Sequence, residues 1–222
     1  MIIGRYKTLD MQKLQPLVEF VKTVEENRPS GGLDQHLYAK AKTNHGSGTH
    51  QQISLGNLQD WSVNNFWQDH QELYQYVKEN TYPEHAPIDN TWFKLYTTET
   101  KLGPTNKGQF IGLHQDREYH TPPDDTMLIH TTSILIERSE DALGGYSVLA
   151  GDHQLQQPKE NRFKDTRDIM SRLIVENLTE PGERITWNGW TMHGVSEMQQ
   201  GSRLSFVVFK KTPFNEDYFK SG

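Results

Sequence analysis

The sequence contains no cysteine among its 222 residues. The chain therefore has no disulfide and no cysteine nucleophile, and any metal must be bound by nitrogen and oxygen ligands. No segment approaches the roughly 20 consecutive apolar residues that span a bilayer, and the first residues lack the apolar core of a secretory signal. We therefore expect a soluble, cytoplasmic protein that does not associate with membranes.

An excess of basic residues is also missing. The chain has 23 Lys and Arg against 29 Asp and Glu, and its formal net charge is −6. Because nucleic-acid backbones are bound by clustered positive charge, this balance argues against nucleic acid as a partner. The 10 Pro and 17 Gly are scattered, as is typical of a loop-rich β fold, and the length suits one domain. The oligomeric state stays open.

Helices are predicted near the N-terminus. Apolar residues recur every three or four positions from Asp10 to Asn27 and from Asp60 to Glu79, which indicates two amphipathic helices that pack on a sheet. The segment from Leu33 to Asn57 is polar, and the composition of Thr43–Thr49 within it predicts a flexible loop. Three histidines in this polar segment are expected to be exposed or to line a substrate entrance: His36, His45 and His50.

Short strands dominate the second half of the sequence. Trp92–Thr98 and Met127–Glu137 are rich in β-favouring residues, and Arg184–Trp187 is strand-like. Apolar spacing predicts one helix from Asn161 to Asn177. Helices followed by several short strands with Gly and Pro turns indicate an α+β protein built on a double-sheeted β barrel or jelly roll.

The segment Arg203–Lys210 alternates in the manner of a strand with two different faces. One face is predicted to carry Arg203, Ser205, Val207 and Phe209, and the other Leu204, Phe206 and Val208.

A histidine and an aspartate lie two residues apart, at His114 and Asp116. In an extended chain such side chains point the same way, so they can form two corners of a 2-His-1-carboxylate iron site. His193 is the candidate for the third corner, and Arg203 follows on the next predicted strand beside Ser205. Each feature alone occurs by chance in many proteins, whereas the combination is specific.

This combination resembles the iron(II)/2-oxoglutarate-dependent oxygenase superfamily, and most closely its prolyl 4-hydroxylase-like branch. The resemblance implies a double-stranded β-helix, which is a jelly-roll barrel, buttressed by N-terminal helices. It further implies one oxygenase domain over residues 1–222, with 1–90 mainly helical support and loops and 91–215 the jelly-roll catalytic core. The matching segments are His114–Asp116, Gly144–Gly145, His193–Val195 and Gly201–Phe206.

Carried over residue by residue, the resemblance makes His114, Asp116 and His193 the iron ligands. Their arrangement leaves positions on the metal for 2-oxoglutarate and dioxygen. Arg203 would bind the far carboxylate of 2-oxoglutarate through paired charge-assisted hydrogen bonds, and Ser205 would donate one more. The cofactors implied are therefore Fe(II), 2-oxoglutarate and O2.

Other aromatic residues have roles that the resemblance leaves open. Tyr96 is similar to the tyrosine that many relatives use to bind the cosubstrate, although a core tyrosine would look identical. Tyr146 stands where relatives commonly have glutamate, which weakens the assignment to the branch. Trp187 and Trp190 would either shield the iron from water or simply pack.

The implied reaction converts 2-oxoglutarate to succinate and carbon dioxide while a substrate is hydroxylated. The expected substrate is a polar small molecule, an amino acid or a peptidyl residue such as proline. Asp116 argues against halogenation, because halogenating relatives carry a small residue there. Arg117–His120 either contact the substrate or are surface charges.

Two other classes of protein remain as alternatives. A binding protein on the same fold would have lost turnover, but the complete ligand set and Arg203 argue against that. A cupin-type metal enzyme that does not use 2-oxoglutarate would usually show more histidine ligands, and it would leave Arg203 and Ser205 unexplained.

Overall fold

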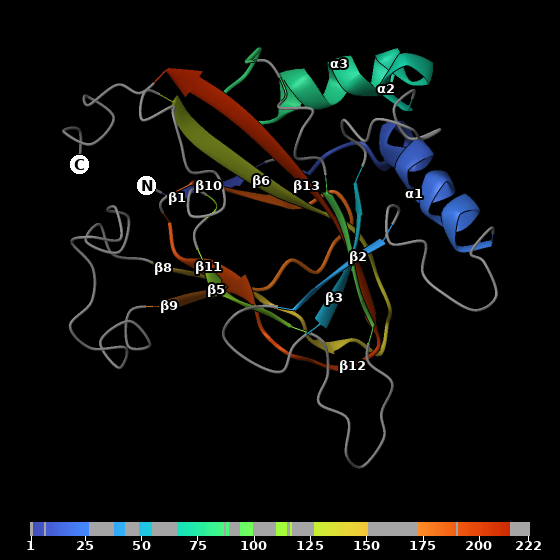
Figure 1. Ribbon diagram of the computed structural model, residues 1–222, viewed down its shortest axis with the longest axis vertical. Coiled ribbons are helices and arrows are strands. Elements are labelled where there is room, and N and C mark those ends of the chain that lie inside the picture. The colour runs from blue at the N-terminus through green and yellow to red at the C-terminus, as the bar shows by residue number, and fades with distance from the viewer. Residues whose placement is uncertain are drawn as a thin grey trace.

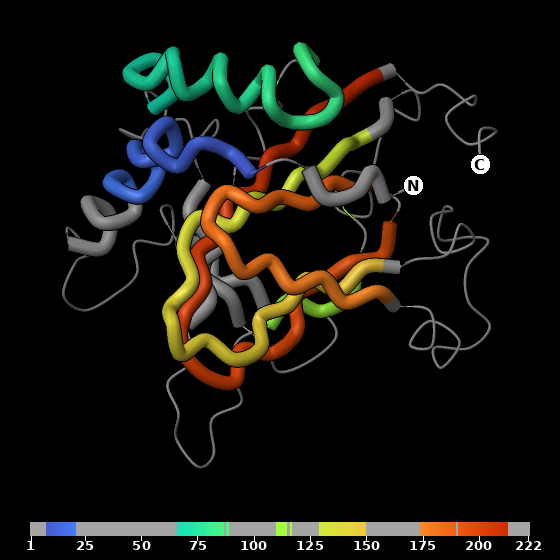
Figure 2. The backbone as a smooth tube through the Cα atoms, turned by 180° about the vertical axis from the view of Figure 1, so that it is seen from behind, coloured from blue at the N-terminus to red at the C-terminus, as the bar shows by residue number. Residues whose placement is uncertain are grey.

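The computed structural model describes residues 2–6, 8–26, 38–42, 49–54, 66–86, 88, 94–99, 110–114, 116, 127–150, 173–189 and 191–213. Within these ranges the strands form antiparallel sheets, and the helices lie against the outer face of the largest sheet (Figure 1). The view from behind shows the same layers, with the helices on one side and the smaller sheet on the other (Figure 2).

Seven strands of the described ranges form the larger sheet. Its centre is formed by β6 and β13, which are 12 residues long each and pair along their lengths. The spatial order is β1 (Ile2–Tyr6), β10 (Arg184–Asn188), β6 (Met127–Arg138), β13 (Ser202–Pro213), β4 (Lys94–Glu99), β3 (Thr49–Ser54) and β2 (Tyr38–Lys42).

The smaller sheet has four strands and faces the inner side of the larger one, so that the two sheets form the jelly roll predicted from the sequence. A two-stranded sheet of β7 (Leu143–Gly144) and β12 (Met198–Gln200) lies apart from it. The order in the four-stranded sheet is β5 (Ile111–His114), β11 (His193–Val195), β8 (Ser147–Ala150) and β9 (Leu173–Glu176).

Strand β13 has the two faces that its alternation predicts. One face is buried against the helices, and the opposite face lines a cavity between the sheets. The prediction for this segment is therefore confirmed. The helix side carries Leu204, Phe206 and Val208, and the cavity side carries Arg203, Ser205, Val207 and Phe209.

In the part of the chain that the structure describes, three helices cover the larger sheet: α1 (Met11–Glu26), α2 (Phe66–Asp69) and α3 (Gln71–Asn80). Both predicted helical segments are confirmed in the described residues, although the second is divided at His70. Each large apolar side chain buried at this interface stabilises the fold by roughly 1.5–3 kcal/mol. No helix in the described ranges is long and apolar enough to cross a membrane. The helix residues in this core include Leu14, Leu17, Phe66, Leu73 and Val77.

A buried lysine joins α3 to β13. Lys210 is 0% exposed, and its Nζ donates hydrogen bonds to the carbonyls of Lys78 at 2.6 Å, Thr81 at 2.7 Å and Pro83 at 2.9 Å. The last carbonyls of a helix lack intrahelical donors and attract cations. Lys210 therefore supplies the donors at the C-terminal end of α3.

We expect the Lys210→Met variant to lose about 3 kcal/mol of unfolding free energy, because it leaves three carbonyls without their charged donor. Urea unfolding measures this loss. The exposed Glu140 offers a control, since Glu140→Gln should cost no more than about 0.5 kcal/mol. Equal losses in the two variants would contradict the role given to Lys210.

Two segments differ from the prediction. The polar region Leu33–Asn57, for which no strand was predicted, contributes β2 and β3 to the larger sheet. Residues 43–48 of the loop predicted over Thr43–Thr49 lie outside the described residues. The prediction of a helix over Asn161–Asn177 is wrong at the C-terminal end of that segment. There, Leu173–Glu176 form β9, which pairs with β8. The remainder of that segment, together with His36 and His45, lies outside the described residues, as does the side chain of His50.

Candidate active site

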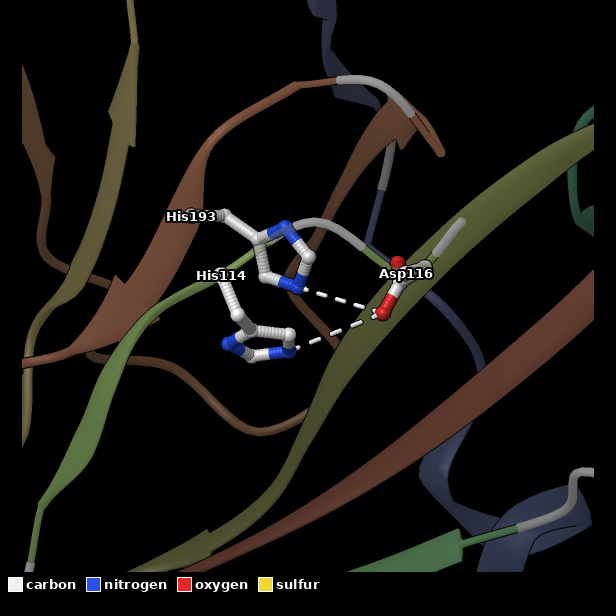
Figure 3. A group of neighbouring side chains, drawn as sticks. All are labelled: His114, Asp116 and His193. Carbon is white, nitrogen blue, oxygen red and sulfur yellow. Dashed lines mark ion pairs between the residues drawn. The ribbon is translucent and has the colours of Figure 1, made fainter. Parts of the chain in front are cut away.

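The three predicted metal ligands come together at one end of the smaller sheet (Figure 3). His114 ends β5 and His193 begins β11, and the two residues are direct partners across these antiparallel strands. Their ring centroids are 4.2 Å apart. Asp116 follows β5, and one potential ligand atom from each of the three side chains lies within 4.8 Å of the others. A single metal ion can therefore contact all three.

Both histidines turn the same nitrogen toward the carboxylate. Nε2 of His193 lies 3.4 Å from Oδ1 of Asp116, and Nε2 of His114 lies 3.7 Å from the same oxygen. The other nitrogen, Nδ1, is 2.8 Å from the Gly112 carbonyl in His114 and 2.9 Å from the Thr191 carbonyl in His193. A carbonyl only accepts, so Nδ1 carries the proton and Nε2 is left to bind a metal.

The electrostatics of this cluster favour a positive charge at its centre. Burial raises the pKa of the Asp116 carboxyl, but the charges and hydrogen bonds of His193 and His114 hold it well below its usual value. Burial lowers the pKa of His193, whereas the Asp116 carboxylate and the Thr191 carbonyl raise it above the ordinary value. The negative charge of Asp116 that favours a proton at this position would also stabilise a metal cation there.

The cavity between the sheets connects the cluster to the arginine on β13. Counting the space open at its mouth, the cavity has an empty volume of about 540 Å³, which is within the usual size of a small-molecule site. Its lining includes all three candidate ligands together with Arg203 and Ser205. The structure therefore brings five of the six predicted site residues to one cavity.

Arg203 has hydrogen-bonding capacity to spare. It is 5% exposed, and it donates from Nη1 to the Gly145 carbonyl at 2.6 Å and from Nη2 to Oγ of Ser147 at 3.3 Å. Its buried Nε and the buried Oγ of Ser205 have no hydrogen-bond partner within the described ranges. Burial and the nearby charge of Arg138 lower the pKa of Arg203 to about 10. Unpaired buried donors are costly, so these atoms suit a bound carboxylate.

The sixth predicted residue, Tyr96, lies on β4 directly beside Ser205 in register, and its side chain lies outside the described residues. Trp187 is buried, and its ring centroid is 4.7 Å from that of His193. Trp190 and the segment 117–120 also lie outside the described residues.

Sequence reasoning missed Thr131 and Ser147, which both line the cavity. Thr131 donates a hydrogen bond to Asp116, and Ser147 accepts one from Arg203. The available signal was the polar run at 130–133 inside an otherwise apolar strand, because buried polar residues need partners.

A family model matches most of this chain. The phytanoyl-CoA dioxygenase family matches residues 33–203, which is more than half of the chain. The chain belongs to this family. The predicted superfamily, enzyme class and cofactors are therefore confirmed: the protein is a 2-oxoglutarate-dependent dioxygenase that uses Fe(II), 2-oxoglutarate and O2. The narrower prolyl 4-hydroxylase-like branch has only loose support, since the family that matches is a different one.

Solved structures share the fold at low identity. AviO1 from Streptomyces viridochromogenes Tue57 is 14% identical over 96% of this chain and 89% of its own, with a TM-score of 0.55. The non-haem alpha-ketoglutarate-dependent epimerase SnoN from nogalamycin biosynthesis is 15% identical over 94% and 78%, with a TM-score of 0.58. A second SnoN structure, in complex with Fe³⁺, alpha-ketoglutarate and nogalamycin RO, is 11% identical over 99% and 85%, with a TM-score of 0.56. No curated protein sequence matches the chain significantly.

The residues present fit the cofactors of the family. Two imidazoles and one carboxylate form the donor set of non-haem iron oxygenases. The unpartnered donors on Arg203 and Ser205 lie in the same cavity and suit the second carboxylate of a dicarboxylic acid.

Proposed function

We propose that this dioxygenase holds iron through His114, Asp116 and His193 and hydroxylates a polar substrate. The observation that supports this most strongly is the single cavity that carries both the ligand cluster and the buried Arg203. A metal site alone would fit many enzymes. A metal site that shares a small cavity with an unpaired arginine donor fits a cosubstrate that has one chelating end and one carboxylate end.

In this proposal Arg203 and Ser205 bind the far carboxylate of 2-oxoglutarate, and Tyr96 donates to the cosubstrate. When bound, iron with 2-oxoglutarate supplies an oxidant from dioxygen, with succinate and carbon dioxide as coproducts. The part played by the chain is to orient the cosubstrate between the two ends of the cavity. Apolar side chains from both sheets exclude water there, among them Leu149, Trp187, Val207 and Phe209.

The proposed substrate is a polar small molecule, an amino acid or a peptidyl residue such as proline. The presence of Asp116 favours hydroxylation over halogenation, since the carboxylate occupies the position that a halide would need. The net charge of −6 argues against nucleic acid. We also propose that residues 1–222 form one oxygenase domain, because strands from both halves of the chain join the larger sheet.

Succinate formation tests the proposal. The protein is loaded with iron(II) without oxygen, 2-oxoglutarate is added, and succinate is measured in air across a panel of amino acids, metabolites, proline-containing peptides and nucleotides. We expect an absorption band on adding 2-oxoglutarate, and succinate that rises with a polar substrate of the panel. The absence of both the band and succinate would reject the proposal, and oxidation without 2-oxoglutarate would favour a cupin-type enzyme.

A further inference from the structure

Asp116 uses its two carboxylate oxygens for different contacts. Oδ1 faces Nε2 of His193 at 3.4 Å and Nε2 of His114 at 3.7 Å. Oδ2 accepts hydrogen bonds from two other residues, Oγ1 of Thr131 and Nε1 of Trp187, the latter at 3.3 Å. One oxygen is therefore directed to the candidate metal position, and the other is occupied by the protein.

This division matters for the number of open positions on a metal. A carboxylate can bind an ion through one oxygen or through both. In a six-coordinate site, three side chains with one ligand atom each leave three positions open, whereas a carboxylate that binds through both oxygens leaves two. A chelating cosubstrate and dioxygen together need three positions.

We propose that Thr131 and Trp187 are positioning residues that hold Asp116 as a one-oxygen metal ligand by engaging its second oxygen. This inference rests on the proposed ligand role of Asp116. Both residues would act through Asp116: their hydrogen bonds reach its second oxygen, and not the candidate metal position or the cosubstrate end of the cavity.

The placement of the two donors supports the proposal. Thr131 on β6 and Trp187 on β10 are direct partners across these strands, so their side chains rise from the same face of the larger sheet. They are 0% and 5% exposed. Asp116 lies beyond the end of β5, so the strand ladder does not fix its carboxylate. The central part of the sheet thus supplies a rigid support for a residue that its own strand does not hold.

Trp187 contacts a second candidate ligand as well. Its ring lies 4.7 Å from the ring of His193, with an angle of 44° between the planes. One indole therefore donates to the aspartate and packs against a histidine. Hydrogen bonds to a charged acceptor in a buried setting are stronger than those between neutral groups. Partners of metal ligands that act in this way typically contribute a factor of about 10–100 to metal affinity.

The adjacent Thr132 provides a matched control. It is also buried, but it lies on the opposite face of β6, where its hydroxyl pairs with that of Thr186 at 2.8 Å. Thr131→Val and Thr132→Val each remove one buried hydroxyl from neighbouring positions of one strand. Only the first of them removes a donor to Asp116.

The test measures Co(II) binding to the full chain without oxygen, by calorimetry and by the visible absorption of the bound ion, which reports the number and geometry of its ligands. We expect Thr131→Val to weaken Co(II) binding about tenfold and to change the spectrum, and Thr131→Val combined with Trp187→Phe to weaken it about a hundredfold. Thr131→Ser keeps the donor and should restore both readouts. Thr132→Val should leave affinity and spectrum as in the wild type.

The outcomes separate this inference from the proposed function. If the wild type binds Co(II), Asp116→Ala removes that binding, and folded Thr131→Val matches the wild type in affinity and spectrum, the positioning role is overturned while the ligand assignment stands. The same holds if Thr132→Val weakens binding as much as Thr131→Val does. If the wild type binds no Co(II) and forms no succinate with iron, both proposals fail.

Discussion

Replacing Asp116 by alanine is expected to abolish iron-dependent succinate formation while the protein still folds. A structural metal bound by four ligands gains about 10–16 kcal/mol, so one ligand accounts for roughly 2.5–4 kcal/mol, or a factor of about 60–700 in affinity. The loss should be at the upper end here, because Asp116 is the only anion in the candidate ligand set. His193→Ala should have the same effect on turnover.

Three measurements define this result: iron(II) affinity, the rate of succinate formation, and thermal unfolding. Alanine at position 116 leaves the donors of Thr131 and Trp187 without their acceptor, which costs about 1–3 kcal/mol of unfolding free energy. A lower melting temperature with a cooperative transition is therefore expected. Asp141→Ala, at an exposed position, is the control and should change neither activity nor affinity. Turnover in Asp116→Ala close to that of the wild type would remove Asp116 from the site.

Some of the site could be predicted because the sequence carries it locally. The alternation over residues 203–210 fixes which side chains share a face, since neighbouring residues of a strand point to opposite sides. That pattern placed Arg203 and Ser205 on the face that lines the cavity. The pair His114 and Asp116 was visible for the same reason, although Asp116 lies beyond the end of its strand.

The approach of His193 to His114 depends on strand pairing rather than on sequence spacing. The two residues meet because β11 pairs with β5 in one particular register. Periodicity cannot supply that register, since it reports the faces of a strand but not its neighbour. The resemblance to a known superfamily provided the missing information, and the pairing of His193 with His114 agrees with it.

The two segments in which strands were not predicted have different physical causes. Leu173–Glu176 is a short apolar run, and such runs do not distinguish helix from strand by period alone. Pairing with β8 decides the matter. By contrast, β2 is an edge strand with lysine at positions 40 and 42. Edge strands often carry charged side chains, which prevent association with other chains. The same charged residues interrupt the apolar alternation by which a strand is predicted.

Replacing Arg203 by glutamine should raise the dissociation constant of 2-oxoglutarate about a hundredfold. Glutamine keeps a polar side chain but loses the charge and the forked donors. Two charge-assisted hydrogen bonds to a carboxylate are together worth about 3 kcal/mol, and each 1.4 kcal/mol corresponds to a factor of ten. Arg203→Lys keeps the charge without the fork and should cost about tenfold. Titration of the iron(II) protein with 2-oxoglutarate in the absence of oxygen measures both constants.

Arg203 also donates hydrogen bonds to the Gly145 carbonyl and to Oγ of Ser147. Its replacement therefore has a second route to weaker 2-oxoglutarate binding, through disturbance of the turn before β8. A change in the ligand separates the two effects. 2-Oxobutyrate has the chelating end of 2-oxoglutarate but lacks the far carboxylate. If Arg203 recognises that carboxylate, the glutamine substitution weakens 2-oxoglutarate binding about a hundredfold and leaves the weaker binding of 2-oxobutyrate nearly unchanged. If both ligands are weakened by the same factor, Arg203 supports the fold of the cavity and does not recognise the cosubstrate.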